Sequence, residues 1–314
     1  MDRLEAMSIL VAAVETGSLS AAGRKLGVPL PTVSRKISEL EAHLNTKLLI
    51  RSTRKLALTD AGEAYVAACR RILEQVSDAE RAAVGEYSAP TGELMVAAPV
   101  AFGRLHVVPV INDFLARFPE IDVRLTLSDR NVHLIEDHVD MAVRIGALPD
   151  SSMVATRAGS VRRVVCGSPA YFAGHGTPTT PADLSDLACI TFDVLGSAAS
   201  WRFRMSGSRS ERSVPVRSRL SVNTAEAAID AAVAGVGITR VLSYQAAHAV
   251  AAGKLKIVLE AFEPEPIPVN LVHAAQGLLP LKMRSFLDFA VPRLRRALSA
   301  AAGAIRNGAD ASVA

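Results

Sequence analysis

Cysteine is scarce in this 314-residue sequence, and its placement excludes two common uses of the residue. The three cysteines, Cys69, Cys166 and Cys189, are far apart and odd in number. They therefore form neither a CxxC metal-binding pair nor a disulfide framework. We interpret them as core thiols in a reducing compartment, which predicts a cytoplasmic location.

Long apolar runs and targeting signals are missing as well. No stretch approaches the roughly 20 apolar residues that span a bilayer. The opening MDRLEAMSIL has no basic start, unbroken apolar run or cleavage site of a secretory signal. Aromatic residues make up 4% of the chain and apolar residues 50%, so we expect a core of Ala, Val, Leu and Ile and no membrane partner.

Signatures of several enzyme classes are absent. No GxSxG elbow of a hydrolase occurs. The GVG run at 235–237 is followed by Arg240 rather than glycine and joins a helix to a strand, the wrong order for a dinucleotide site. His133, His138 and Asp140 span a predicted helix and strand without a cysteine, which favours a solvated surface over a metal site. The sequence thus predicts no enzyme activity and no cofactor or metal.

Positive charge is concentrated near the N-terminus. Between Ser18 and Leu58 there are eight cationic and two anionic side chains, an excess larger than the net charge of +4 for the whole chain. A surface that faces phosphates requires such a concentration. On charge alone, a solvated basic face without a partner remains the alternative.

Apolar spacing in the same region predicts three short helices. The first ends near Gly17, and Ser18 caps a second that ends at Gly27. Pro31 suits the first position of a third helix, where its missing N–H costs nothing. This helix has a buried stripe of Val33, Ile37, Leu40 and Leu44. Its opposite face carries Thr32, Arg35, Ser38 and Glu39, with Ser34 and Lys36 on the flanks.

Two short helices joined by a tight turn, the second with a cationic polar face, describe a helix-turn-helix. The next segment predicts a β-hairpin wing, with strands at 48–50 and 56–59 around the basic loop RSTRK. Arg51, Arg54 and Lys55 of this loop suit contacts with a phosphate backbone. Helix pairs are common in proteins that never touch DNA, but the added wing favours a DNA-binding domain over residues 1–59.

The run GSLSAAGRKLGVPLPTVSRKISELEAHLNTKLLIRSTRKLALTDAG resembles the N-terminal signature of LysR-type transcriptional regulators. The resemblance implies that Pro31, Thr32, Ser34, Arg35 and Lys36 lie in the major groove of double-stranded DNA. It places Arg51 and Arg54 in the wing. Members often have Gln or Ser just before the recognition helix, where this chain has Leu30 after Pro29. We therefore expect an unusual base preference.

A long helix is predicted over residues 60–89. Asp60 followed by Glu63 resembles a capping box. The helix either packs on its own domain or, as the resemblance implies, forms a homodimer that reads an inverted repeat. Its alanine-rich seam is thin, so we expect the C-terminal domain to share in assembly, and the resemblance alone implies a homotetramer. The seam has heptad spacing and comprises Tyr65, Ala68, Ile72, Val76, Ala79 and Ala83.

From Gly92 onward, strands and helices alternate, which is typical of a mostly parallel sheet covered on both faces. The segments DMAVRIGALPDSSMVA, SPAYFAGHGTPTTPADL, AAVAGVGI and SFLDFAVPRL extend the resemblance to about residue 298. Strands are predicted at 92–99, 121–128, 140–146, 162–168, 188–193, 237–243, 254–260 and 268–274. Helices are predicted at 102–118, 133–139, around 170, at 224–234 and at 280–298.

The chain is expected to cross between two subdomains near 160–163 and again near 264–268. Residues 90–299 would then form an effector-binding domain with a cleft, as in periplasmic solute-binding proteins and the family's effector domain. Subdomain I comprises 90–162 and 267–299, and subdomain II comprises 163–266. The small, polar tail at 300–314 is predicted to be disordered.

Open α/β sheets bind ligands at the carboxyl ends of their strands. Family members often carry a Ser or Thr after the first strand to hold an effector carboxylate, but the segment 99–102 has no hydroxyl. A more apolar or aromatic effector is therefore favoured. Simple packing remains the alternative for each predicted contact residue, namely Val100, Ala101, Phe102, Ser128, Asp129, Gly146, Phe192 and Thr224.

The predicted architecture is an α/β C-terminal domain of two βαβ subdomains, preceded by an all-α winged helix-turn-helix and a linker helix. The predicted function is sequence-specific transcriptional regulation of the LysR type, controlled by a small-molecule effector in the cleft. RNA polymerase is expected as a partner if the protein is an activator. Two alternatives stay open: a solute-binding or enzymatic α/β protein with an incidental helical head, and a nucleoid-type protein without a preferred site.

Overall fold

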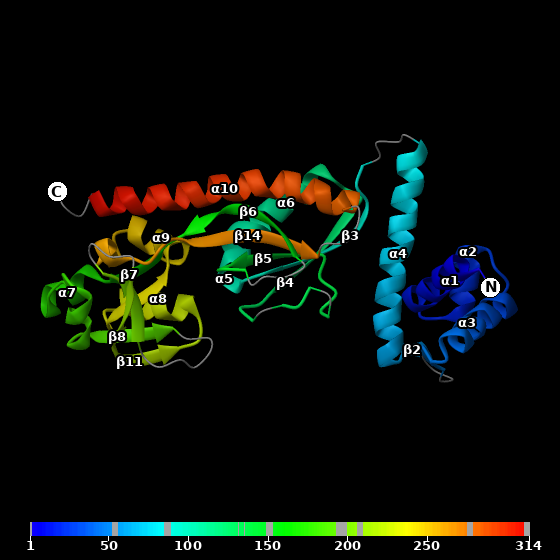
Figure 1. Cartoon of the computed structure of the whole chain (residues 1–314), viewed down its shortest axis with the longest axis horizontal. Helices are drawn as coiled ribbons and strands as arrows, with labels where there is room; N and C mark the ends of the chain where they lie inside the picture. The colour runs from blue at the N-terminus through cyan, green and yellow to red at the C-terminus, as the bar shows by residue number, and fades with distance from the viewer. Residues whose placement is uncertain are drawn as a thin grey trace. The chain divides into compact units, whose positions relative to one another are not determined.

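A computed structural model describes residues 2–51, 56–84, 89–130, 132–134, 136–148, 153–192, 200–205, 210–274 and 279–310. The chain divides into two compact units, Met1–Ala89 and Pro90–Ala314 (Figure 1). Across the described ranges, no single helix has the length and apolar character needed to cross a membrane.

The N-terminal unit is built on three helices that share one apolar cluster. Ser18 caps the second helix by accepting a hydrogen bond from the amide of Ala21, and Gly17 and Gly27 end the first two helices with φ of +67°. Val33, Ile37 and Leu40 are fully buried, as their spacing predicted. The helices are α1 (Arg3–Thr16), α2 (Leu19–Leu26) and α3 (Leu30–Leu44).

Helix α3 begins one residue earlier than predicted. Pro29 is its N-cap, so Leu30 holds the first helical position and Pro31 the second. Proline is tolerated there because the first amides of a helix lack carbonyl partners within it. No side chain caps this end; the amides of Thr32 and Val33 instead donate to the Pro29 carbonyl, at 2.9 and 3.1 Å.

The wing and the long helix follow directly. Strands β1 (Leu49–Arg51) and β2 (Leu56–Leu58) pair antiparallel, and α4 runs from Asp60 to Val84. Its cap is Thr59 rather than the predicted Asp60, since the Thr59 hydroxyl accepts from the Gly62 amide at 3.0 Å. Gly62 also allows a close approach, because a Cβ there would lie 2.1 Å from the Leu48 carbonyl oxygen.

The apolar residues of α4 have two environments. Val66 and Cys69 are buried against the helices of their own unit. Farther along, Ile72 is 38% exposed and Ala79 is exposed. Packing onto its own domain therefore accounts for the first turns of this helix and leaves part of the predicted seam uncovered.

The C-terminal unit contains two five-stranded sheets and a separate hairpin. Both sheets mix parallel and antiparallel strands, whereas the sequence predicted mostly parallel sheets. One has the strand order β4-β3-β5-β14-β6 and the other β11-β8-β12-β7-β13. The first contains β3 (Gly92–Ala98), β4 (Ile121–Leu127), β5 (Met141–Ile145), β6 (Met153–Val161) and β14 (Ile267–Ala274). The second contains β7 (Arg163–Gly167), β8 (Ala188–Phe192), β11 (Arg217–Val222), β12 (Ile238–Leu242) and β13 (Lys256–Val258), and the hairpin is β9 (Ser200–Arg204) with β10 (Glu211–Pro215).

A continuous helical segment covers the first sheet. It consists of α5 (Val100–Phe102), the π-helical turn η1 (Gly103–Val107) and α6 (Val108–Arg117), and begins two residues before the predicted Phe102. The π-turn ends two residues before Pro109, whose missing amide hydrogen interrupts the regular ladder. Phe114 then packs edge-on against Phe286, with ring centroids 5.1 Å apart.

The second sheet is covered on both faces. Helices α8 (Ala225–Val233) and α9 (Ser243–Ala251) pack on the face that includes Val164 and Cys166. Trp201 and Phe203 of the hairpin pack with Val165 and Ile238 in another cluster, together with α7 (Pro169–His175). Two short 3-10 helices, η2 (Pro181–Ser185) and η3 (Glu260–Phe262), complete this part.

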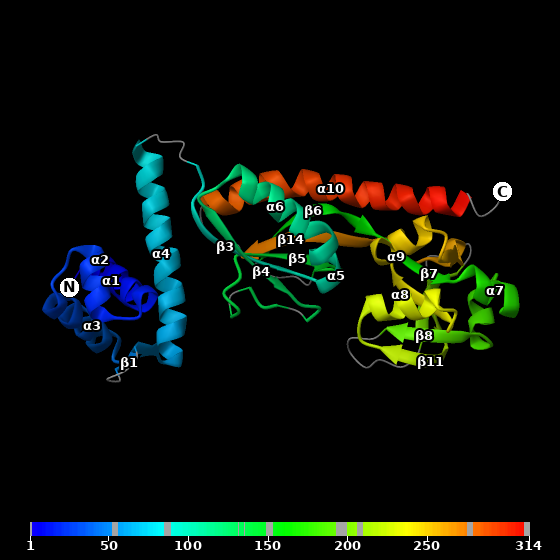
Figure 2. The same ribbon diagram turned by 180° about the vertical axis from the view of Figure 1, so that it is seen from behind.

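The chain passes between the sheets twice. Strand β6 ends at Val161 in the first sheet and β7 begins at Arg163 in the second, while the return leads through η3 to β14 at Ile267. Helix α10 (Leu281–Asp310) runs past both sheets (Figure 2). It contributes Phe286 and Leu294 to the apolar cluster of the first sheet and Ile305 to that of the second. The sequence predicted that this helix ends at 298 and that the tail from 300 onward is disordered. The structure instead continues the helix to Asp310, because the buried Ile305 holds the added turns against the second sheet.

One predicted helix and several strands differ from the sequence interpretation. The segment 133–139 is not a helix: among its described residues, a single turn forms, in which the Asp137 carboxylate accepts from the His133 amide at 2.8 Å. His138 then has φ of 53°, which ends the turn. Strands β6, β9, β10 and β11 and helix α9 were not predicted.

All three cysteines are free and buried, as predicted for core thiols. Desolvation by burial raises the pKa of the Cys166 thiol to about 12. The same cause dominates at Cys189, where the pKa is also raised to about 12, and at Cys69, where it is raised. These thiols therefore stay protonated at neutral pH.

Candidate functional site

Helix α3 presents a polar face away from the core. Arg35 and Ser38 are exposed on it, while Thr32 and Ser34 are half-buried. The opposite stripe, with Val33 and Ile37, is fully buried, so the rotation of the helix is set by its apolar side. This orientation follows from the local sequence pattern.

The two predicted cations of α3 differ in placement. The Arg35 guanidinium pairs with Glu39 one turn later at 2.7 Å, and its side chain is 61% exposed. An exposed pair of this kind contributes little to stability, so Arg35 can exchange Glu39 for another anion. The Lys36 ammonium pairs with Glu5 of α1, and its side chain is only 14% exposed. Lys36 therefore helps to join α3 to α1.

The structure describes the two strands of the wing but not the loop between them. Arg51 ends β1, and its side chain lies outside the described part, as do Arg54 and Lys55. The predicted phosphate contacts of these three residues remain predictions.

A buried carboxylate that the sequence analysis did not single out joins α3 to the wing. Glu41 is 3% exposed and accepts hydrogen bonds from the amides of Leu48 and Leu49, at 2.9 and 3.1 Å. The Lys47 ammonium donates to its other oxygen at 3.0 Å. Burial alone would raise the pKa of this carboxyl group, but the three hydrogen bonds outweigh burial and hold it below the ordinary value. The available signal was its place four residues after Ile37, on the apolar side of α3.

In the C-terminal unit, part of the predicted ligand site gathers at one edge of the first sheet. The Val100 amide at the start of α5 donates to the Asp129 carboxylate at 3.0 Å. The Ser128 amide donates to the Ala98 carbonyl at 2.9 Å. Ala101 is buried, whereas Val100 is 38% exposed at this edge.

Phe102 links this edge to the second sheet. It is fully buried, and its ring centroid lies 4.9 Å from His106 of η1 and 5.3 Å from Tyr244 of α9. An ion pair of 3.6 Å also joins Arg104 of η1 to Glu226 of α8. Contacts from the helical segment that follows β3 thus reach α8 and α9 of the second sheet.

His106 and Tyr244 were missed by the sequence analysis. Burial lowers the pKa of His106, and its Nε2 is a buried atom without a hydrogen-bond partner in the described structure. Burial first, and then the Asp129 charge, raises the pKa of Tyr244. Tyr244 lies just beyond the carboxyl end of β12, so the rule applied to the other strands would have included it.

The remaining predicted contacts have structural partners of their own. Thr224 caps α8 by accepting from the Ala227 amide at 3.3 Å, and Phe192 packs against the cluster that contains Ala225. Gly146 has φ of +139°, and its amide donates to the Pro268 carbonyl at 3.0 Å, which ties the end of β5 to β14. Gly146 and Thr224 thus each make a hydrogen bond that stabilises the local fold.

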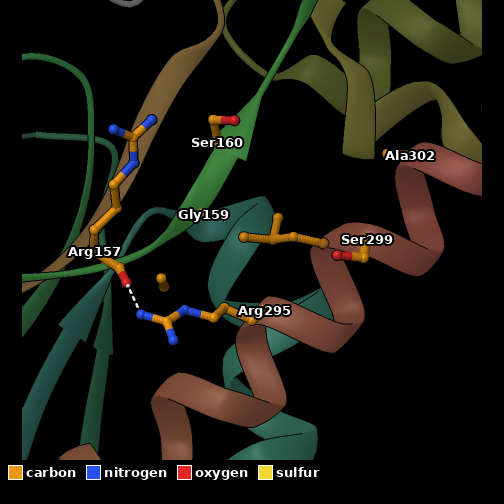
Figure 3. Close-up of a pocket in the computed structure, with 8 residues that line it drawn as sticks. Arg157, Gly159, Ser160, Arg295, Ser299 and Ala302 are labelled. Carbon is orange, nitrogen blue, oxygen red and sulfur yellow. Dashed lines mark hydrogen bonds between the residues drawn. The ribbon is translucent and has the colours of Figure 1, made fainter.

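A pocket of about 470 Å³ opens between β6 and α10, and none of the predicted effector contacts lines it. Figure 3 shows Arg157 and Ser160 on β6 and Arg295 and Ser299 on α10 around it. The Arg295 guanidinium donates to the Arg157 carbonyl at 2.9 Å and so ties α10 to the sheet edge.

Asp140, considered above with two histidines, has a structural partner. Its carboxylate accepts from the Met95 amide at 2.9 Å and lies 3.9 Å from the Lys282 ammonium. Within the described ranges, no group of three or more His, Cys, Asp or Glu side chains is placed to hold a metal ion.

Comparison with known families gives two matches along the chain. Residues 4–63 match the model described as "Bacterial regulatory helix-turn-helix protein, lysR family". Residues 88–295 match the model described as "LysR substrate binding domain". Together these regions contain the helix-turn-helix, the wing and both five-stranded sheets.

Individual relatives are similar over nearly the whole chain. An HTH-type transcriptional regulator of Xanthomonas campestris is 35% identical, over 91% of this chain and 84% of the relative. An HTH-type transcriptional repressor of Pseudomonas aeruginosa is 33% identical, over 92% and 91%. The solved structure of CrgA, a LysR-type transcriptional regulator from Neisseria meningitidis, is 30% identical, covers 92% of this chain and 98% of its own, and has a TM-score of 0.59.

Proposed function

The chain belongs to the LysR family of DNA-binding transcriptional regulators, and we propose that it recognises an inverted repeat through α3 as a homodimer. Its C-terminal unit is the family's effector-binding domain. The observation that carries the proposal is the exposed polar face of α3, held by a buried apolar stripe and by the Glu41 brace to the wing. A helix presented in this way enters the major groove with its first turns against the base edges.

Six side chains are proposed to hold the DNA besides Pro31 and Thr32. Arg35 and Ser34 read or position bases from α3, with Lys36 nearby on the flank. Arg51, Arg54 and Lys55 follow the backbone from the wing. Five of the eight cations between Ser18 and Leu58 belong to this set, and a solute-binding protein would not need such a local excess of positive charge.

A footprint on the DNA upstream of its own gene, at physiological salt, tests this proposal. We expect a discrete protected region with two-fold symmetry. Arg35→Ala should weaken binding to that site about tenfold, because a base-contacting arginine contributes roughly 1–3 kcal/mol. Arg117→Ala, an exposed arginine of α6 in the other unit, is the matched control.

Three results would count against the proposal. Unchanged affinity of the Arg35→Ala protein would remove α3 as the reading helix. Uniform coverage without a preferred site would favour a nucleoid-type protein. A missing footprint would favour a solute-binding or enzymatic role for the C-terminal unit.

The effector is proposed to bind between the two sheets of the C-terminal unit. Val100, Ala101, Phe102, Ser128 and Asp129 supply one side, and Phe192 and Thr224 the other, with Gly146 near the crossover. The buried ring of Phe102 and the lack of a hydroxyl at 99–102 support an apolar or aromatic compound. The protein is proposed to act in the cytoplasm without enzyme activity, as a dimer or tetramer, and with RNA polymerase if it is an activator.

A further inference from the structure

The start of α3 carries an apolar side chain where a polar one would be expected to meet DNA. Leu30 occupies the first helical position and is 46% exposed, the most exposed leucine in the described chain. A single exposed leucine needs no explanation by itself. Its position is what matters, because the first turn of a recognition helix is the part nearest the base edges.

The backbone around Leu30 is held rigidly. Pro29 precedes it with φ of −59°, and Pro31 follows it. The Val28 amide donates to the Gly23 carbonyl at 2.8 Å, and a Cβ on Gly23 would lie 2.6 Å from the Val28 oxygen. The turn from α2 into α3 is therefore tightly packed. The backbone at Leu30 is therefore held in place, which lowers the entropy cost of a contact.

The chemistry of the major groove leaves one partner for such a side chain. Leucine has no donor or acceptor, so it cannot pair with the N7, O6, N6, N4 or O4 atoms that distinguish the bases. The thymine 5-methyl is the apolar group exposed in that groove. Placing Leu30 against a polar base edge would desolvate that edge without replacing its hydrogen bonds.

We infer that Leu30 is a specificity-determining residue that packs on the 5-methyl group of one thymine in each half-site. The inference rests on the proposed entry of α3 into the major groove. Arg35, five residues farther along α3 and exposed, supplies the hydrogen bonds that Leu30 cannot make. The chain therefore selects thymine at the Leu30 position by burial of a methyl group.

Replacing single thymines by deoxyuridine tests the inference, because this change removes only the methyl group. The DNA is the operator defined by the footprint, with each thymine replaced in turn in both half-sites. Removing one buried methyl group should weaken wild-type binding about fourfold per half-site, from roughly 0.8 kcal/mol per buried carbon. Only one thymine position per half-site should respond through residue 30.

Substitutions of Leu30 test whether the effect of the thymine methyl group comes from this side chain. Leu30→Ala should bind the thymine and deoxyuridine operators about equally, whereas Leu30→Met, which keeps an apolar chain, should retain the difference. Leu4→Ala is the matched control, since Leu4 is 42% exposed on α1 and should leave the difference unchanged. If Leu30→Ala binds too weakly to compare, Leu30→Gln should shift the base selected at that position from randomised DNA.

The outcomes separate this inference from the proposed function. Suppose that the footprint is specific and depends on Arg35, but that substituting residue 30 changes the methyl effect of none of the thymines. This result would overturn the role of Leu30 and leave the proposed function standing. An unchanged base preference in Leu30→Gln would do the same. A thymine that loses its methyl effect only in Leu30→Ala and Leu30→Gln supports it.

Discussion

At the scale of single residues, the buried Glu41 carboxylate holds the wing to α3 in the DNA-binding unit. It is 3% exposed and satisfies two backbone amides that begin the wing. Leaving buried donors without an acceptor is more costly than losing a surface ion pair. Glu41 therefore matters more for the fold than the half-buried Glu39, although the two acids are two positions apart on one helix.

Glu41→Gln should lower the free energy of unfolding of the N-terminal unit by about 2 kcal/mol at pH 7, because charge-assisted hydrogen bonds are lost. The pKa of Glu41 is lowered in the folded state, so its stabilisation is present above the ordinary carboxyl pKa and is lost as the pH falls through the lowered value. Urea unfolding of both proteins at several pH values between neutral and strongly acidic measures this.

The matched control is Glu39→Gln, which removes an exposed pair with Arg35 and should cost no more than about 0.5 kcal/mol. An equal effect of the two substitutions, or a stability difference that does not narrow in acid, would show that the hydrogen bonds to Glu41 do not stabilise the unit.

At the scale of elements, α4 has an apolar surface that its own unit leaves uncovered. Ile72 is 38% exposed in the middle of a charged helix. In the proposed homodimer, a second copy of the same helix would cover it.

Ile72→Glu should weaken dimerisation at least tenfold, because two like charges would be placed within an apolar seam. Sedimentation analysis over a range of concentrations measures the change. Ser77→Glu introduces the same charge on another side of α4 and is expected to leave association unchanged. A dimer equally strong in both variants would assign assembly to other surfaces.

At the scale of the whole molecule, α10 connects the two sheets of the C-terminal unit. In its first half, Phe286 and Leu294 are buried against the first sheet. In its second half, Ile305 is buried against the second sheet. Movement between the sheets must therefore carry this helix along or break its contacts with α9.

Ending the chain after Leu298 should lower the stability of the C-terminal unit by about 2 kcal/mol, since the burial of Ile305 is lost. Hydrogen exchange should become faster in α9, which packs against α10. Ending the chain after Asp310 is the control and should change neither. Unchanged exchange in α9 after the longer deletion would contradict a connecting role.

The parts of the fold that were predicted closely are those specified by residue patterns within one short stretch of the chain. The stripe of Val33, Ile37 and Leu40 and the flanking glycines specify the helix-turn-helix within short stretches of chain, so its elements were predicted closely. Strand β6 gave no such signal, because its exposed and buried residues do not alternate regularly. Helix α9 begins at Ser243, and its N-cap is Leu242 rather than a Ser, Thr, Asp or Asn, so it was missed for that reason.

Long-range contacts set the features that the sequence did not indicate. The end of α10 depends on the burial of Ile305 against residues far away in the chain. The placement of Lys36 depends on Glu5 of another helix, and the meeting of Phe102 with Tyr244 depends on the packing of two sheets. Spacing along one segment carries no information about such partners.

The burial of Cys69, Cys166 and Cys189 has a practical consequence for spectroscopy. Protonated thiols without solvent access are poor nucleophiles toward maleimides and iodoacetamides. A cysteine introduced on an exposed position of α10 or α4 can thus be labelled selectively in the native protein, with the natural cysteines kept in place. Distance measurements between such labels become possible without redesigning the core.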